Sequence, residues 1–305
     1  MSGPEPRTAH ASPVVVHGAL VLVQVAFASL AVFGKIAMRT VPPHGLALAR
    51  IGGTALVLVT LELVRTGLPR IPRGDLLRLA LYSVIGVAGN QILFLSGLSR
   101  TTAINAVVLT STIPVFTVAA GIVLGRERPR PALLAGIVVS LAGVLWLVGV
   151  DGFHVGIDTV VGDVMITVNC AGYAVYLVLV RDVIARHGAT RVVTVAFAMG
   201  TVLALPFGGG ALAGALAELD LTTALLVVYI VLVPTTFTYL ANAWALRFAR
   251  ASVVAIYIYV QPVVAGVLAV WLLDEEPSAR ALVAGVAVFA GIALVTEPWR
   301  RAAPS

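Results

Sequence analysis

Residues 102–124 read TAINAVVLTSTIPVFTVAAGIVL, a stretch of 23 residues without a charged side chain. A helix needs about 20 predominantly apolar residues to cross the hydrocarbon core of a bilayer, so this stretch is long enough to span a membrane. Nine further stretches are of similar length and mostly apolar, at residues 14–34, 45–64, 76–96, 131–149, 161–180, 192–210, 222–243, 252–273 and 280–296. The sequence therefore predicts ten membrane-spanning segments.

The composition of the whole chain agrees with this prediction. Of its 305 residues, 60% are hydrophobic and 11% are charged, and the mean hydropathy is +1.04. Soluble domains are about 45–50% apolar and about 25% charged, so a water-soluble globule, a disordered chain and a nucleic-acid-binding protein all fit poorly. Backbone polar groups in lipid must be satisfied internally, and the stretches lack the alternating polarity of barrel strands. We therefore expect an all-α membrane protein.

The two halves of the chain resemble each other at an offset of 148 residues. Each half contains five predicted spans, and an odd number of crossings means that the second half inserts with the opposite orientation. The pattern predicts two inverted five-helix repeats, over residues 14–150 and 161–297, an arrangement that recurs in secondary transporters. The identities at this offset are Leu98/Leu246, Ala103/Ala251, Pro114/Pro262, Glu127/Glu275, Pro129/Pro277 and Gly143/Gly291.

The distribution of charge supports the opposite orientations of the two halves. The loop 126–130 carries a net charge of +2, whereas the corresponding loop 274–280 carries −2. With both termini in the cytoplasm, 15 of the 20 Lys and Arg residues lie on the cytoplasmic side, in agreement with the positive-inside rule. We expect a multi-pass protein of the plasma (inner) membrane, with cytoplasmic tails at 1–13 and 298–305 and an external linker at 151–160.

Motifs of enzyme chemistry are missing from the sequence. It contains no HExxH, GxSxG or Walker A pattern, and its five His residues do not stand at metal-ligand spacing. We therefore expect no catalytic site, no metal and no cofactor. Cys170 is the single cysteine, which excludes an intramolecular disulfide.

Polar residues recur inside the predicted spans, where contact with lipid is costly and the bundle interior or a wet cavity is preferred. Such residues either line a cavity or form hydrogen bonds between helices, and for a single Thr or Ser we favour the second role. A lining of amides, hydroxyls and aromatic rings suits a small zwitterionic or amphipathic solute. The predicted cavity residues are Gln24, Asn90, Gln91, Asn105, Asn169, Tyr173, Tyr176, Thr238, Tyr239, Asn242, Tyr257 and Gln261.

Prolines, end charges and small residues suggest roles for positions outside this polar set. Pro114 and Pro262 each remove a helix hydrogen bond at equivalent positions, so we expect bends there that serve in gating, with static kinks as the alternative. Lys35 and Arg50 stand at the outer ends of the first two spans, where they attract an anionic substrate to the external mouth or extend to lipid headgroups. Small residues predict close packing of spans 131–149 and 280–296, in a monomer or a homodimer; they are Ala132, Gly136, Ser140, Ala281 and Gly285.

Several short motifs resemble those of one transporter family. They are the stretch 27–35, Leu48-Ala49-Arg50, Ile113-Pro114-Val115-Phe116 with Gln261-Pro262-Val263, Gly125-Arg126-Glu127 with Asp274-Glu275, and the stretch 171–181. On these motifs the chain resembles the ten-helix EamA-type transporters of the drug/metabolite transporter superfamily, over about residues 14–297. One Gly-Glu motif has an inserted Arg, and the other lacks its Gly. The resemblance implies a central cavity between the repeats and export or exchange of amino acids, nucleotide-related compounds, sugars or drugs.

These observations predict a secondary transporter that moves a small-molecule substrate across the lipid bilayer by alternating access. The best candidate for the substrate is an aromatic or other hydrophobic amino acid, and a drug or a nucleoside or sugar derivative is the alternative in the same fold. A membrane sensor or assembly factor without transport is the alternative from another class. Since no Asp, Glu or His stands in the middle of a predicted span, we expect exchange or facilitated diffusion rather than proton antiport through a mid-membrane carboxylate.

Overall fold

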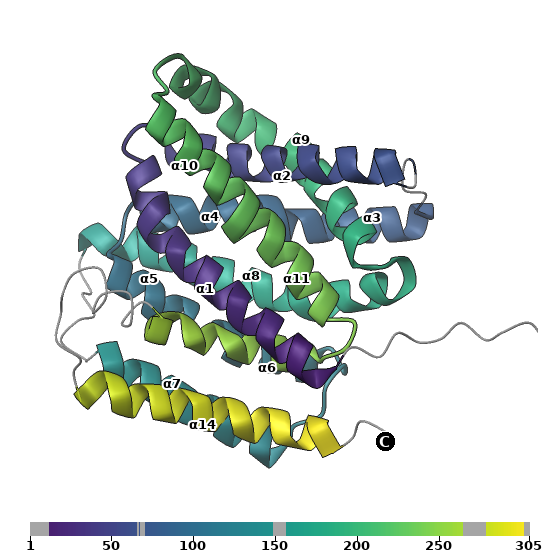
Figure 1. Cartoon of the computed structure of the whole chain (residues 1–305), viewed down its shortest axis with the longest axis vertical. Coiled ribbons are helices and arrows are strands. Elements are labelled where there is room, and N and C mark those ends of the chain that lie inside the picture. Colours follow the sequence, from purple (N-terminus) through teal and green to yellow (C-terminus); the bar gives the residue numbers. More distant parts are fainter. Residues whose placement is uncertain (1–11, 66, 68–70, 149–156, 265–278, 302–305) are drawn as a thin grey trace, which may run out of the picture.

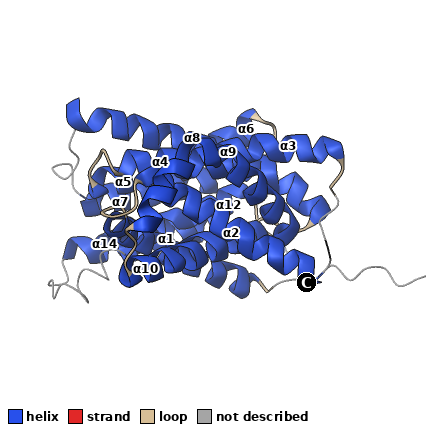
Figure 2. Cartoon of the chain, turned by 90° about the horizontal axis from the view of Figure 1, so that it is seen from above, coloured by secondary structure: helices blue, strands red, loops and turns tan. Residues whose placement is uncertain are grey.

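The computed structural model describes residues 12–65, 67, 71–148, 157–264 and 279–301, and within them every regular element is a helix (Figure 1, Figure 2). Seven helical stretches are long and apolar enough to cross a membrane. Three shorter apolar helices cover Pro131–Trp146, Ala251–Val264 and Leu282–Thr296. The described part of the chain is thus that of an all-helical, multi-pass membrane protein, as expected.

The first half of the chain contains helices α1 to α7. Two long helices, α1 (Pro13–Ala37) and α2 (Pro43–Arg65), come first. A continuous rod follows, made of α3 (Arg73–Ser83), the π-helical segment η1 (Val84–Ala88) and α4 (Gly89–Leu98). The half ends with α5 (Ala103–Thr110), α6 (Ile113–Val123) and α7 (Pro131–Val148).

The second half has the same order of elements. It contains α8 (Ile157–His187), α9 (Ala189–Ala217), a rod of α10 (Leu221–Val231), π-helical η3 (Leu232–Phe237) and α11 (Thr238–Ala245), then α12 (Ala251–Ile256), the 3-10 turn η4 (Tyr257–Tyr259), helical residues 260–264 and α14 (Ala279–Arg301). α8 begins inside the segment 151–160, which we expected to be a linker, and α14 runs into the expected tail 298–305. The remainder of those segments, most of the tail 1–13 and residues 274–278 lie outside the described residues.

Corresponding elements of the two halves begin 148 residues apart. This spacing holds for α3 and α10, for η1 and η3, for α5 and α12, and for α7 and α14. π-helical turns are rare and are often found at functional positions. The two π-helical segments are related by the same offset as the sequence identities, so the repeat in the sequence is also a repeat in the structure.

Pro234 lies within the π-helical segment η3 and leaves one backbone carbonyl without its usual helical partner. A proline inside a helix frees the carbonyl group four residues earlier, which here is that of Ile230. The Thr235 hydroxyl donates a hydrogen bond of 2.7 Å to the Ile230 carbonyl oxygen, and the Thr236 hydroxyl donates one of 2.8 Å to that of Val231. Side chains of the same helix thus satisfy backbone groups that lipid could not.

The prolines expected to bend their spans each follow an interruption of the helix. Pro114 stands in the first turn of α6, directly after the break at residues 111–112, and Pro262 follows η4. Proline is favourable in a first turn, because the N–H that it lacks would have no partner within the helix. The bends therefore lie a few residues before the prolines, at equivalent places in the two halves.

Helices α7 and α14 lie side by side along one edge of the molecule (Figure 1). A Cβ atom added to Gly136 would lie 2.5 Å from the Gly291 carbonyl oxygen, so the contact requires glycine. The Ser140 hydroxyl donates a hydrogen bond of 3.2 Å to the carbonyl oxygen of Val288, 148 residues later in the chain. This is the close packing that small residues predict for these two spans, although Gly285 takes no part in the tight contact.

Candidate functional site

A cavity lies between the two halves, and it is lined by residues of α1, α2, α4, α5, α6, α8, α11, α12, η4 and the segment that follows η4. The space open to the centres of water molecules is about 100 Å³. About 10–15 Å³ of such space admits one water molecule, so the cavity admits several. In the described part of the chain, α7 and α14 contribute nothing to its walls. The polar lining residues are Gln24, Arg50, Asn90, Gln91, Thr110, Asn169, Tyr173, Tyr239, Asn242 and Gln261.

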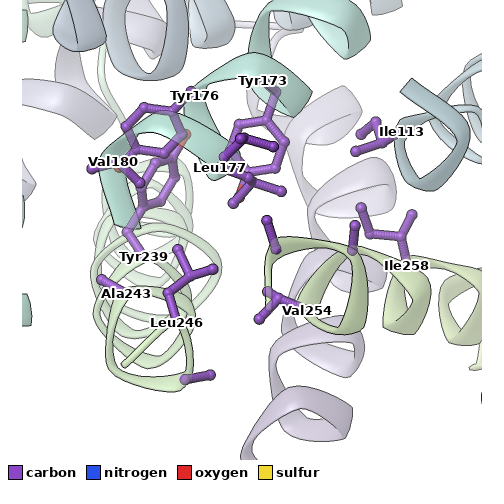
Figure 3. Packing of buried hydrophobic residues seen from close by; sticks show 14 of the residues in the cluster. Ile113, Tyr173, Tyr176, Leu177, Val180, Tyr239, Ala243, Leu246, Val254 and Ile258 are labelled. Atoms are coloured by element: carbon purple, nitrogen blue, oxygen red, sulfur yellow. The ribbon is translucent and has the colours of Figure 1, made fainter. Parts of the chain in front are cut away.

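Aliphatic and aromatic side chains form the rest of the lining. Figure 3 shows Tyr173 and Leu177 of α8 turned towards the space that Val254 and Ile258 face, with Ile113 of α6 beside them. Sites for small molecules are usually lined in this way, by many apolar groups and a few polar groups that fix the orientation of the ligand.

Asn90 is the centre of a hydrogen-bond network that joins both halves. The Tyr239 hydroxyl of α11 lies 3.0 Å from the Asn90 Oδ1 and 3.1 Å from the Gly86 carbonyl oxygen. The Asn169 Nδ2 of α8 donates a hydrogen bond of 2.6 Å to the Asn90 carbonyl oxygen. α4 is thereby tied to α8 and α11 at the wall of the cavity.

Two further amide contacts cross the cavity wall. The Gln261 Nε2 donates a hydrogen bond of 2.7 Å to the Gln24 Oε1, which connects the segment after η4 with α1. The Asn242 Nδ2 donates a longer bond of 3.4 Å to the Tyr173 hydroxyl. All four residues come from spans in which the sequence predicts cavity-facing polar groups.

Gln91 differs from these residues in the hydrogen bonding of its amide. Its side chain is 1% exposed and lines the cavity, and within the described residues neither its Oε1 nor its Nε2 forms a hydrogen bond of normal geometry, although the amide lies near the Tyr239 hydroxyl. The Asn242 Oδ1 also has no hydrogen-bond partner among the described residues. A buried polar group without a partner costs about 1–3 kcal/mol. These amide atoms are therefore placed to bind a polar group of a solute.

The expectation that Arg50 stands at the external mouth is wrong. Arg50 is 2% exposed, lines the cavity and donates a hydrogen bond of 3.0 Å from its Nε to the Thr235 hydroxyl oxygen. The reason is that α2 begins at Pro43, so seven residues, or about 10 Å of helix, separate Arg50 from its start. Lys35 is exposed in the last turn of α1 and does not line the cavity.

Eight of the twelve predicted cavity residues line the cavity: Gln24, Asn90, Gln91, Asn169, Tyr173, Tyr239, Asn242 and Gln261. The other four, Asn105, Tyr176, Thr238 and Tyr257, do not. Sequence reasoning also missed Thr110 and the apolar lining, because apolar residues cover every face of these helices and leave no signal of orientation.

Three of the four outliers are held by protein contacts behind the cavity wall. Tyr176 stacks on Tyr173 with ring centroids 5.8 Å apart. The Thr238 hydroxyl donates to carbonyl groups of its own helix, which is the alternative role that we favoured for single Thr residues. The Tyr257 hydroxyl is bonded to the imidazole of His17 on α1.

The fourth outlier, Asn105, belongs to one of two carboxylate contacts between the halves. The Asp163 carboxylate of α8 accepts hydrogen bonds from the Thr101 hydroxyl, at 2.6 Å, and from the Asn105 Nδ2, at 3.1 and 3.2 Å. The Glu127 carboxylate, which follows α6, accepts hydrogen bonds from the backbone N–H of Ser252, at 3.2 Å, and from its hydroxyl. Each carboxylate thus holds the first turn of α5 or α12, which correspond in the two halves.

Known proteins resemble the chain over nearly its whole length. An uncharacterized transporter of Archaeoglobus fulgidus is 29% identical over 284 residues, which cover 92% of this chain and 96% of that protein. A probable terminal-alkyne amino-acid exporter of Streptantibioticus cattleyicolor is 29% identical over 281 residues, 92% of each chain. A crystal structure of another protein has the same fold, with a TM-score of 0.76 and 22% identity over 96% of this chain and 100% of that one.

The model of the EamA-like transporter family matches the chain twice, at residues 16–149 and 160–297. The two matches cover the same parts of the chain as the two sets of helices that begin 148 residues apart. Both the family and the transporter names of the relatives indicate a transporter rather than an enzyme. The chain belongs to the EamA-like transporter family.

Proposed function

We propose that the protein is a secondary transporter that exports or exchanges a small amphipathic solute through the cavity between its halves. The observation that carries the proposal is the cavity itself, since helices of both halves line it with amides and aromatic rings. The best candidate for the substrate is an amino acid with an aromatic or other hydrophobic side chain. The name of the Streptantibioticus cattleyicolor relative, an amino-acid exporter, supports this class of substrate.

Alternating access requires two halves that can exchange conformations around a central site. The contact between α7 and α14 supports a two-fold relation of this kind. A Cβ added to Gly136 would lie 2.5 Å from the Gly291 carbonyl oxygen, and a Cβ added to Gly143 would lie 3.1 Å from the Ala284 carbonyl oxygen. At the 148-residue offset, Gly136 corresponds to Ala284 and Gly143 corresponds to Gly291. The contact of Gly136 with Gly291 is therefore the counterpart of the contact of Ala284 with Gly143, as expected for two halves related by a two-fold axis. We take this as support for ten spans in two inverted repeats. The proposal of cytoplasmic termini and of the plasma membrane rests instead on the distribution of Lys and Arg along the chain.

The two carboxylate contacts are suited to close the ends of such a transporter. Asp163, in the second half, holds the start of α5 in the first half, and Glu127, in the first half, holds the start of α12 in the second. In two inverted repeats, equivalent helix starts lie on opposite sides of the membrane. The proposal is that each contact forms when its end of the cavity closes and breaks when that end opens, with the bends before Pro114 and Pro262 as the points of movement.

Counterflow in proteoliposomes tests the transport function. Vesicles preloaded with one amino acid, such as Phe, Trp, Leu or Thr, receive a labelled trace of the same compound. We expect accumulation in the wild type and its loss in Asn169→Ala and Gln261→Ala, which alter the cavity wall. Val202→Ala is the matched control, because Val202 is 72% exposed on α9, outside the cavity. Absence of flux for amino acids, drugs, nucleosides and sugar derivatives with folded protein would favour a sensor instead.

The same vesicles test the mode of coupling. The proposal is exchange or facilitated diffusion, since no lining residue in the described part of the chain carries a carboxylate or an imidazole. Counterflow is expected to be unchanged when the pH difference across the membrane is collapsed. Uptake driven by a pH gradient, and lost in Glu62→Gln or Asp163→Asn, would replace this mode with proton coupling.

A further inference from the structure

We propose that Arg50 binds a carboxylate of the transported solute, so that the cavity selects carboxylic acids and zwitterions over amines of the same shape. This inference rests on the proposed function, because it takes the cavity as the transport site. It adds the chemical group that the site recognises and the residue that recognises it.

The charge of the cavity supports a carboxylate as the ligand of Arg50. Among the lining residues that the structure describes, Arg50 is the only one with a formal charge, and no Asp or Glu lines the cavity with it. None of the ion pairs of the described residues includes Arg50, which is 2% exposed. A buried cation inside a membrane protein is costly unless it is paired, and such residues commonly mark substrate pathways. An anionic group of the solute would supply the missing counter-charge.

The guanidinium group of Arg50 is oriented so that a carboxylate can bind its terminal nitrogens. Its Nε is bonded to the Thr235 hydroxyl oxygen at 3.0 Å, and that hydroxyl in turn donates to the Ile230 carbonyl oxygen. Thr235 therefore acts as an acceptor that orients Arg50. The π-helical segment that contains Pro234 holds Thr235 in place. Guanidinium has five N–H donors, and the four on its terminal nitrogens have no partner within the described residues. A carboxylate binds two such donors side by side.

Other groups in the cavity can bind the rest of the solute. The Gln91 amide is buried in the same cavity without a hydrogen bond of normal geometry to the described residues, and it can add a donor to a carboxylate or an acceptor to an ammonium group. The Asn242 Oδ1 is a second free acceptor. The rings of Tyr173 and Tyr239 offer faces that attract an ammonium group or pack on an aromatic side chain. An α-amino acid can bind to all of these groups. An amine without a carboxylate has only a positive charge, which the positive charge of Arg50 repels.

The experiment compares solutes that share an aromatic or aliphatic side chain and carry a carboxylate, an ammonium group or both. Purified full-length protein in detergent is heated with L-phenylalanine, 3-phenylpropanoate, L-phenylalaninamide or 2-phenylethylamine, and with the matching leucine and tryptophan series. We expect the carboxylates to raise the midpoint of thermal unfolding at concentrations at least tenfold lower than the amides and amines require. Arg50→Gln is expected to remove this preference. Arg50→Lys, which keeps the charge without the planar fork, is expected to keep the preference with weaker binding.

A second measurement separates this inference from the proposed function. The same compounds compete against the labelled amino acid in counterflow with wild-type protein, which needs no variant to fold. Flux that amines inhibit as well as the matching acids do would overturn the role of Arg50 and leave transport intact. An unchanged preference for the acid in Arg50→Gln would also overturn it. Absence of both flux and binding for the entire panel would count against the amino-acid transporter itself.

Discussion

We expect Ser252→Ala to open one end of the transporter. The Glu127 carboxylate accepts two hydrogen bonds from Ser252, one from the backbone N–H over 3.2 Å and one from the hydroxyl. Glu127 is 9% exposed, so water competes weakly for its oxygens. Alanine keeps the backbone bond and removes only the hydroxyl bond, which makes the change the smallest that weakens this contact.

The expected size of the effect follows from the kind of bond that is lost. A hydrogen bond to a charged group contributes about 1.5–3 kcal/mol net. If only conformations closed at this end contain the bond, its loss favours the conformations open at this end by roughly 10- to 150-fold, since about 1.4 kcal/mol is a factor of ten. A change of that size in the population of open protein is well within reach of a labelling experiment.

The assay measures how fast a membrane-impermeant maleimide reaches the cavity. Cys170, the single native cysteine, is replaced by Ala, and Thr110, which lines the cavity, by Cys. Ser252→Ala is then expected to raise the labelling rate about tenfold or more from the side on which Glu127 lies, and to lower it from the other side. Ser99→Ala is the matched control, because the Ser99 hydroxyl bonds only the carbonyl of its own helix. Equal rates for Ser252→Ala and its parent, from both sides, would refute the closing role of this contact.

Three other contacts lead to outcomes that separate measurements can check. Thr101→Val removes a hydrogen bond to Asp163, and we expect faster labelling of the cavity from the opposite side of the membrane; an unchanged rate would separate this contact from gating. Gly136→Val overpacks the contact with α14, and we expect it to lower the stability by about 1–3 kcal/mol in thermal unfolding. Gly285→Val is the control, because the nearest neighbour of its added Cβ is 3.8 Å away, and we expect a nearly unchanged midpoint. Tyr239→Phe removes the hydroxyl that is bonded to α4, so a loss of about 1 kcal/mol is expected in the same assay, and an unaltered midpoint would contradict the assigned bonds.

Most of the helical framework could be predicted from the sequence. Each predicted span overlaps a helical segment of the structure, because length and hydropathy are properties of a single stretch of chain. The interruptions could not be predicted in the same way. In the stretch 102–124, Pro114 indicates a bend, but the sequence does not indicate that the helix stops and restarts at residues 111–112, ahead of the proline.

The candidate site was predicted in part. Asn90, Gln91 and Asn169 line the cavity as expected, since an amide within a span has few ways to avoid lipid. Asn105 shows why the rule has exceptions: its amide is equally well satisfied by the Asp163 carboxylate away from the cavity. Residue type and spacing do not distinguish these two outcomes, because the partner stands 58 residues away in the sequence.

The sequence by itself determined that this chain is an all-helical membrane protein with two similar halves, because apolar length and the 148-residue offset depend only on the order of residues along the chain. The tertiary structure alone decided which face of each helix meets the cavity. That rotation is set by contacts between distant segments, such as Gly136 against Gly291. The placement of Arg50 depends on it as well: a residue that sequence reasoning assigned to the membrane surface lies in the wall of the cavity, bonded to a hydroxyl 185 residues later in the chain.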